Sequence, residues 1–375
     1  TLKGWTILLA IITFSMSLLG TFLVRSGVIT SVHAFATDPA RGLYILALLV
    51  FVIGVSLVLF AWRAPKLSGG GSFALLSRES ALLGNNVLLA VACAAVLLGT
   101  LYPLFLDALN LGKISVGPPY FEATFVPLMT PVVFLMVIAP FVRWKGDDAS
   151  RLGRMLWLSA LVSVIIGGGL SLSAWVLLGS AHLLVRRLTE RAGAAVGARL
   201  RGIPSAWWGM WLAHLGIGVF VIGVTLVGSL EQDLDVKMRE GQSAQLAGYT
   251  FTFRGAIERD GPNYDADRGI IDVTRGERAI ATLTPEKRLY RAQGMPMTEA
   301  SIDVGPLRDV YVSLGDQVEP GSWIVSLHYR PFISWIWAGC ILMALGGIFA
   351  AADKRYRRLA ERDAAKPAGA VAQAG

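Results

Sequence analysis

The stretch from Ala206 to Leu230, AWWGMWLAHLGIGVFVIGVTLVGSL, decides the fold class because it contains no Asp, Glu, Lys or Arg. As an α-helix it extends about 37 Å, enough to cross the roughly 30 Å hydrocarbon core of a bilayer. The chain changes character directly after it, at Glu231-Gln232-Asp233. The sequence therefore predicts a membrane span followed by a segment in water.

Similar apolar stretches recur along the 375 residues, of which 54% are hydrophobic and only 16% are charged. This composition is far from that of a water-soluble protein. Five more clear spans are predicted, at Trp5 to Val24, Gly42 to Trp62, Ala81 to Phe105, Ala123 to Val142 and Pro331 to Ala351. We therefore expect a polytopic α-helical membrane protein.

A further apolar stretch, Met155 to Val185, is too long for one simple span and short for two. Basic residues mark the cytoplasmic ends of spans. They gather in four places: Arg63, Lys66 and Arg78; Arg143, Lys145, Arg151 and Arg154; Arg186, Arg187, Arg191, Arg199 and Arg201; and the C-terminal tail. Placing all four in the cytoplasm requires Met155 to Val185 to be a hairpin of two short spans, or a re-entrant pair, turning near Gly167 to Gly169. The count becomes eight spans, with seven as the alternative.

The same assignment places a long polar section, Glu231 to Arg330, on the opposite, non-cytoplasmic side. Short runs typical of β-strands occur in it at Tyr249 to Phe253, Gly269 to Val273, Ala279 to Leu283 and Trp323 to His328. We therefore divide the chain into a helical bundle (1–230), a β-rich barrel or sandwich (231–330), a final membrane helix (331–351) and a basic tail that becomes disordered (352–375).

The formal charge of +8 does not indicate a nucleic-acid partner, because the positive residues lie in short loops beside apolar runs. The two cysteines, Cys93 and Cys340, lie inside apolar runs without CxxC spacing, which argues against thiol chemistry. The chain begins at Thr1, almost directly in an apolar run, so we expect a fragment or a split subunit.

His33 lies in a short loop between two spans, within Arg25 to Arg41, on the predicted non-cytoplasmic side. An imidazole there is suited to ligate haem iron at the membrane surface, and Arg25 and Arg41 are suited to pair with haem propionates. The alternative is an ordinary interfacial histidine between two arginines whose side chains extend to the membrane surface.

His214 lies inside the span quoted above, where a polar side chain is costly unless it has a partner. One interpretation is a ligand to a haem within the bilayer, with Gly216 and Gly218 leaving room for the macrocycle. The other is a hydrogen bond to a neighbouring helix. The residues alone leave both open.

The remaining candidates are weaker. His182 precedes basic residues at a predicted membrane boundary, and His328 ends a predicted strand. Membrane-interface anchoring accounts for the tryptophans at span ends, Trp207, Trp208, Trp211, Trp335 and Trp337. The sequence contains no Walker A motif, no HExxH and no cysteine–histidine pattern with zinc spacing.

Several motifs resemble one known family. They are Gly20-Thr21-Phe22-Leu23-Val24-Arg25-Ser26-Gly27, Ser31-Val32-His33-Ala34-Phe35-Ala36, Gly99-Thr100-Leu101-Tyr102-Pro103, Pro119-Tyr120-Phe121, Trp211-Leu212-Ala213-His214 and Pro285-Glu286-Lys287-Arg288-x-Tyr290. Together they closely resemble the cytochrome c maturation protein F family, CcmF. Because they extend over most of the chain, the resemblance is specific.

The resemblance implies a subunit of the bacterial inner-membrane haem lyase (cytochrome c synthetase), whose large domain faces the periplasm. Haem arrives on the chaperone CcmE, and CcmH and CcmI help to present the CxxCH thiols of apocytochrome c. In this family two periplasmic histidines ligate the incoming haem, and two membrane histidines ligate a resident haem b. His33 matches a periplasmic ligand, and His214 matches a membrane ligand.

The sequence also departs from the family pattern. The tryptophan-rich periplasmic signature with its Trp-Trp-Asp core has no counterpart, since Trp207-Trp208 is followed by Gly-Met. The first histidine of each pair is also absent, so we expect a chain that corresponds to the C-terminal part of CcmF and partners a missing N-terminal half.

Two other classes of function remain as alternatives. A haem or small-molecule transporter would use the predicted hairpin near Gly167 as a site at the membrane midplane. A non-catalytic assembly scaffold would use the β-rich domain to bind partners. Whether the chain is itself an enzyme stays open, since no side chain stands out as a general acid or base.

Overall fold

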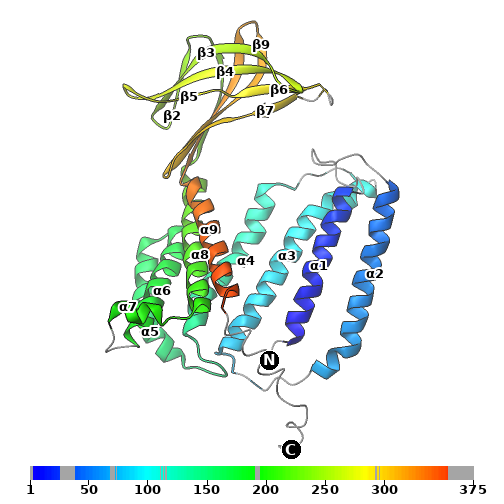
Figure 1. Ribbon diagram of the computed structural model, residues 1–375, viewed down its shortest axis with the longest axis vertical. Coiled ribbons are helices and arrows are strands. Elements are labelled where there is room, and N and C mark those ends of the chain that lie inside the picture. Colours follow the sequence, from blue (N-terminus) through cyan, green and yellow to red (C-terminus); the bar gives the residue numbers. More distant parts are fainter. Residues whose placement is uncertain are drawn as a thin grey trace, which may run out of the picture. The chain divides into compact units, whose positions relative to one another are not determined.

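The structure, a computed structural model, describes residues 3–25, 39–67, 72, 74–109, 111–112, 114, 116–190, 195–291, 294 and 296–353. The chain forms two compact units that divide after Leu158, and each is described by itself. Long helices make up the first unit, and the second combines helices with a β-domain (Figure 1). The predicted combination of membrane-type helices and a β-rich domain is confirmed.

The first unit contains α1 (Lys3–Arg25), α2 (Pro39–Arg63), η1 (Ala64–Leu67), α3 (Arg78–Ala108), α4 (Pro118–Ile138), η2 (Ala139–Phe141) and the start of α5 (Ala149–Ile166). Large apolar side chains remain exposed on these helices: Leu43, Phe51 and Val58 of α2 are each at least 67% exposed. Water would make this exposure costly, whereas lipid tails solvate it. The fourth span was predicted to begin at Ala123, but α4 starts at Pro118, because proline is well tolerated in the first turn of a helix.

Two of the family-like motifs meet between α3 and α4. The ring of Tyr120 lies against Gly99, where a Cβ atom would come within 2.3 Å of the ring. The Tyr120 hydroxyl donates a hydrogen bond of 2.9 Å to the carbonyl of Ala95. The glycine admits the ring and the carbonyl satisfies the hydroxyl, so these two motifs fix how α3 and α4 pack.

Seven described helices are long and apolar enough to cross a membrane: α1 to α5, α8 (Ser205–Leu230) and α9 (Ile333–Ala351). An additional long helix, α6 (Leu170–Thr189), is less apolar because it carries serines, a histidine and two arginines. It follows α5 through Gly167 and Gly168, both at positive φ (67° and 54°), which only glycine adopts without strain. The predicted turn near Gly167 is thus confirmed. The turn joins two helices that are about 27 Å and 30 Å long. It therefore lies at the ends of two long helices and does not interrupt a single helix halfway along.

The closest packing in the second unit is between α8 and α9. Three glycines of α8 recur every seventh residue, Gly209, Gly216 and Gly223, and Gly339 and Gly346 of α9 are also seven apart. A Cβ on Gly216 would lie 2.8 Å from the carbonyl oxygen of Gly339, and one on Gly209 would lie 2.5 Å from that of Gly346. We call these five glycines the glycine seam. They let the two helix backbones touch, which is how close helix pairs form in membranes.

Both ends of this helix pair are tied. At one end, the Asp353 carboxylate accepts a 2.8 Å hydrogen bond from the amide of Ala206, and the Ser205 hydroxyl donates to the carbonyl of Phe349 at 2.6 Å. Asp353 therefore satisfies an open amide in the first turn of α8. At the other end, both helices continue directly into neighbouring strands, β1 (Gln232–Arg239) and β10 (Ser322–Pro331), which pair antiparallel.

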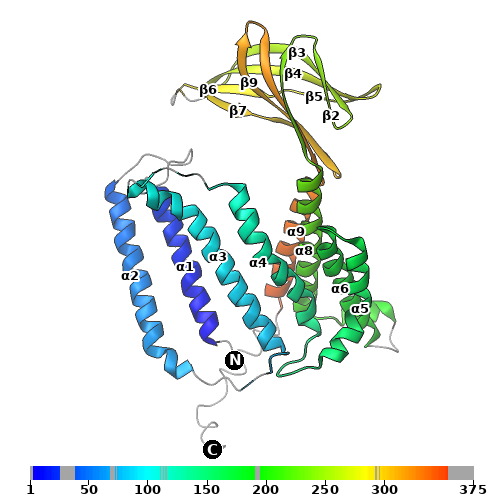
Figure 2. The ribbon, with the colours of Figure 1, turned by 180° about the vertical axis from the view of Figure 1, so that it is seen from behind.

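The β-domain consists of two antiparallel sheets (Figures 1 and 2). One has the order β1-β10-β9-β8, and the other has β2-β3-β4-β6-β7 with β5 paired to β4. The remaining strands are β2 (Ser243–Leu246), β3 (Tyr249–Asp260), β4 (Tyr264–Arg275), β5 (Arg278–Leu283), β6 (Glu286–Tyr290), β7 (Pro296–Glu299), β8 (Ser301–Val304) and β9 (Arg308–Glu319). Of the two predicted architectures, the domain is therefore the sandwich.

Alternating apolar residues from both sheets form the core of the sandwich. Phe251, Phe253 and Ile271 come from one sheet, and Val312 and Leu327 come from the other; none of the five is exposed. The four strands predicted from the sequence all lie in the observed strands. Period-two alternation places every second side chain inside, which accounts for both the prediction and the core.

We predict that Gly216→Ala destabilises the protein by about 1–3 kcal/mol, because the new methyl group meets backbone atoms of α9 that cannot rotate away. Gly228→Ala on the same helix is the matched control, since its Cβ would have nothing within 4 Å. Thermal unfolding of the purified protein in detergent measures both. Equal unfolding midpoints for the two variants would contradict the role of the glycine seam.

Candidate functional site

His214 lies in the interior of α8, about 14 Å along the helix from its first residue. Its imidazole is half-buried. Nδ1 lies 2.7 Å from the carbonyl oxygen of Met210, one turn earlier, and donates to it. A proton held on Nδ1 makes Nε2 the basic nitrogen of the ring, which is the nitrogen that ligates a metal when the other one donates to a carbonyl.

Two neighbouring helices, α9 and α6, pack against α8. The glycine seam faces α9, and Trp211, Gly218 and Thr225 face α6: the Trp211 indole donates to Ser180 at 2.8 Å, and Gly218 lies against Leu177. At 100° per residue, His214 lies roughly 160° from the seam and roughly 40° from the middle of the α6 contact. It therefore borders the α6 contact, on the side of α8 that also carries Met210, Ile217 and Val221, all half-buried; we call this side the third face.

The expectation that Gly216 and Gly218 leave room for haem is wrong. A Cβ on Gly216 would meet Gly339, and one on Gly218 would lie 2.7 Å from Leu177. The space beside each glycine is filled by another helix. Any group bound by His214 must therefore lie on the third face, among Met210, Ile217 and Val221.

The predicted surface site falls largely outside the described residues. His33 belongs to residues 26–38, so its prediction is not tested. Arg25 is the last residue of α1 and Arg41 is the third residue of α2, and the structure describes only their backbone. Because α1 and α2 are successive helices that pack on each other, these two positions lie at the same end of the pair.

His182 lies on α6 and is half-buried. His328 makes more contacts than the sequence indicated. Its Nδ1 lies 2.6 Å from the Asp233 carboxylate, and its ring stacks on Tyr311 at 4.3 Å. Arg330 also pairs with Asp233 at 2.8 Å. These residues lie side by side on neighbouring strands close to the ends of α8 and α9, a contact that only strand register reveals.

The family-like motif beginning at Pro285 builds a charged cluster on β6. Glu286 is 3% exposed, and its carboxylate accepts hydrogen bonds from Arg288 at 2.8 Å and from Arg268 at 2.7 Å. Arg259 contributes a third, longer ion pair at 3.4 Å. Burial alone would raise the pKa of Glu286, but the hydrogen bonds from Arg288 and Arg268 outweigh it and hold the pKa below its usual value.

Within the described ranges, no three His, Cys, Asp or Glu side chains lie together in a way that could hold a metal ion. His214 lies on a membrane-type helix, and its hydrogen bond to the Met210 carbonyl fixes the tautomer of its imidazole. An imidazole on an apolar helix face is a suitable donor for haem iron, so the residues present fit a haem ligand there.

Comparison with known proteins agrees with this arrangement of helices and sandwich. A family model described as the CcmF C-terminal beta-sandwich matches residues 229–331. The chain is 49% identical over 371 residues to the cytochrome c-type biogenesis protein CcmF of Pseudomonas aeruginosa, covering 95% of this chain and 56% of that protein. The chain belongs to the CcmF family.

Other members show the same extent of similarity. CcmF of Escherichia coli K12 is 46% identical over 365 residues, covering 95% of this chain and 56% of that protein. A solved structure named cytochrome c haem lyase CcmF has a TM-score of 0.69 and 19% identity, covering 93% of this chain and 55% of the other. The chain thus spans just over half the length of these CcmF proteins.

We predict that acid weakens the β-domain in part through Glu286. Because its pKa is lower when folded than when unfolded, its contribution is present above about pH 4.5 and is lost as the pH falls through the folded value. Glu286→Gln should cost about 1–3 kcal/mol at neutral pH and reduce the additional loss between pH 5 and pH 3.

Hydrogen exchange of the β4 and β6 amides measures this effect. Glu258→Gln on β3 is the control, because Glu258 is exposed. The role of Glu286 is disproved if its variant shows the same neutral-pH protection and the same acid response as the wild type.

Proposed function

We propose that this chain acts in the attachment of haem to apocytochrome c, as part of a haem lyase. The support is the identity with proteins named for cytochrome c-type biogenesis and the likeness in fold to one named haem lyase. The observation that carries the proposal in this chain is the membrane-embedded His214, whose Nδ1 donates to Met210. We assign His214 as a ligand to a resident haem b and His33 as a ligand to the haem substrate.

Bound at His214, a haem would supply electron-transfer chemistry that no side chain possesses. The residues of the chain would hold and orient it. The Met210 carbonyl fixes the imidazole tautomer and the plane of the ring, which preserves Nε2 as the donor. Ile217 and Val221 keep water from the site, since both are apolar members of the same helix face.

At the surface, His33 would hold substrate haem while Arg25 and Arg41 pair with its propionates. Both arginines occupy helix ends, which come before and after His33 in the sequence. We assign no acid or base to this step: the chain would contribute position, while the thioether bonds form between haem vinyl groups and cysteine thiols. CcmE would deliver the haem, and CcmH and CcmI would present the apocytochrome.

The proposed setting is the bacterial inner membrane, with the β-domain in the periplasm. The basic residues at the opposite ends of the helices support this orientation, because Arg186 and Arg187 lie in the last turn of α6 and Arg199 and Arg201 precede α8. The β-domain follows the other end of α8.

We expect His214→Ala to lower the b-type haem content of the purified protein at least about tenfold, since an axial ligand is lost. The chain is expressed with the part of the Pseudomonas aeruginosa CcmF sequence that it does not match, and absorbance spectra quantify the haem. His182→Ala, which removes an imidazole from the neighbouring helix α6, should leave the spectrum unchanged. A full b-type signal in the His214 variant would refute the assignment.

His33→Ala should have the opposite pattern. It should retain the b-type spectrum but abolish covalent cytochrome c assembly in cells that depend on this protein, measured by haem staining of denatured cytochrome. Haem flux into proteoliposomes without any apocytochrome would instead favour the transporter alternative. Normal cytochrome assembly by the variant would exclude His33 as a ligand to the haem substrate.

A further inference from the structure

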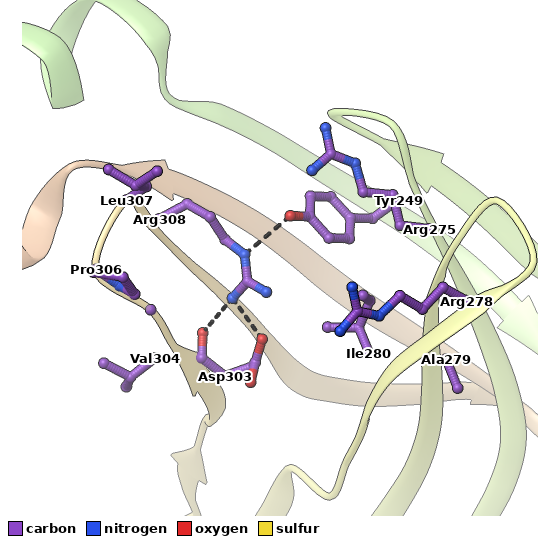
Figure 3. Close-up of a pocket in the computed structure, with 11 residues that line it drawn as sticks. Tyr249, Arg275, Arg278, Ala279, Ile280, Asp303, Val304, Pro306, Leu307 and Arg308 are labelled. Carbon is purple, nitrogen blue, oxygen red and sulfur yellow. Dashed lines mark hydrogen bonds and ion pairs between the residues drawn. The ribbon is translucent and has the colours of Figure 1, made fainter.

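The β-domain contains a pocket that the haem assignments do not use (Figure 3). It has a volume of about 570 Å³ and lies where the two sheets meet at their edges, between β5 and β8. The turn Gly305-Pro306-Leu307 lines one side, and the turn between β4 and β5 lines the other. The opening arises because these two edge strands do not pair with each other.

The charge of the lining is positive. Three arginines, Arg275, Arg278 and Arg308, line the pocket together with a single carboxylate, Asp303, which leaves a net charge of +2 from three arginines less one aspartate. Asp303 pairs with Arg308. Within the part of the chain that the structure describes, neither Arg275 nor Arg278 has a carboxylate partner.

The aromatic ring of Tyr249 positions the arginines. The guanidinium carbons of Arg275 and Arg308 lie 5.3 Å and 5.4 Å from the ring centroid, and Arg308 Nε donates to the Tyr249 hydroxyl at 3.0 Å. Tyr249 itself is 4% exposed, so the ring is a fixed platform. Arg275 is therefore held in place beside the pocket without its charge being neutralised.

The pocket lies next to the start of a membrane helix. The Leu307 carbonyl accepts a 2.8 Å hydrogen bond from the Phe332 amide, and the Gly305 and Pro306 carbonyls accept from Ser334 at 2.9 Å and Trp335 at 3.0 Å. Ser334 and Trp335 belong to the first turn of α9. The turn is thus fixed to the first turn of α9, which carries Trp335, a residue type enriched where membrane helices meet lipid headgroups.

Apolar side chains are exposed at the same place. Val304 is 69% exposed and Leu307 is 58% exposed, and both line the pocket. In water this exposure is unfavourable, whereas at a membrane surface both side chains can contact acyl chains. The pocket therefore combines unneutralised guanidinium groups with apolar side chains beside a membrane span.

We infer that this pocket binds the headgroup of an anionic phospholipid, with the phosphate on Arg275 and Arg278 and the acyl chains against Leu307 and Val304. Guanidinium groups bind phosphate oxygens through paired hydrogen bonds. The residues that line the pocket include no histidine, cysteine or methionine. The pocket can therefore bind an acidic group but lacks these three ligands for haem iron. The bound lipid anchors the β-domain to the membrane surface. This site is independent of the proposed haem ligands.

Native mass spectrometry of the full chain in detergent tests the site, using phosphatidylglycerol and phosphatidylcholine with identical acyl chains. Phosphatidylglycerol should bind more tightly, and Arg275→Gln with Arg278→Gln should weaken its binding about 30-fold. Replacing the same two arginines with lysine should restore only part of the binding, because the charges remain but the paired hydrogen bonds of the guanidinium groups are lost.

The matched control removes two charges elsewhere on the domain, by Arg239→Gln with Arg254→Gln, and should leave lipid binding unchanged. Neither residue lines the pocket. Equal binding of the two lipids, or full binding by the Arg275 and Arg278 glutamine variant, would overturn the inference. Displacement of the lipid by millimolar inorganic phosphate would also overturn it, because the site would then bind free phosphate. So would a glutamine variant that loses binding of added haem but not of phosphatidylglycerol, because the site would then bind haem.

Discussion

The contact between α8 and α9 is the constraint on which the second unit depends. Glycines at seven-residue intervals remove the side chains that would separate the two backbones, so the helices touch along their length. The same two helices continue into β1 and β10, which are the first and last strands of the domain. The sandwich is therefore carried on a pair of backbones, tied at the far end by Asp353 and Ala206.

This packing also limits where chemistry can occur. One face of α8 is taken by α9 and another by α6, which leaves the face of Met210, His214 and Ile217. Membrane helices pack closely through small residues, and the glycine seam of α8 does so on the side opposite His214. Gly216 and Gly218, which the sequence predicts to leave room beside His214, are the residues against which α9 and α6 pack.

The β-domain follows a different rule, since its surface is organised by arginines. Around Glu286 several arginines share one buried carboxylate, and at Asp303 an arginine is fully paired. Arg275 and Arg278 depart from this pattern, and they lie beside the turn that is bonded to α9. Among the described arginines and lysines of the domain, these two have no carboxylate partner, and such a pair near the end of a membrane-type helix is suited to an anionic surface.

Hydropathy and charge placement alone predicted the long apolar helices, the turn near Gly167 and four strands of the sandwich, and they singled out His214 as a polar residue inside an apolar helix, because each depends on residues that are neighbours in sequence. Tertiary structure alone decided which glycines pack against α9, that Asp233 orients His328, and that the turn at Pro306 meets the arginines of β4 and β5. Those contacts join residues far apart in the chain. Strand register and helix rotation determine them, and neither leaves a local signal in the sequence.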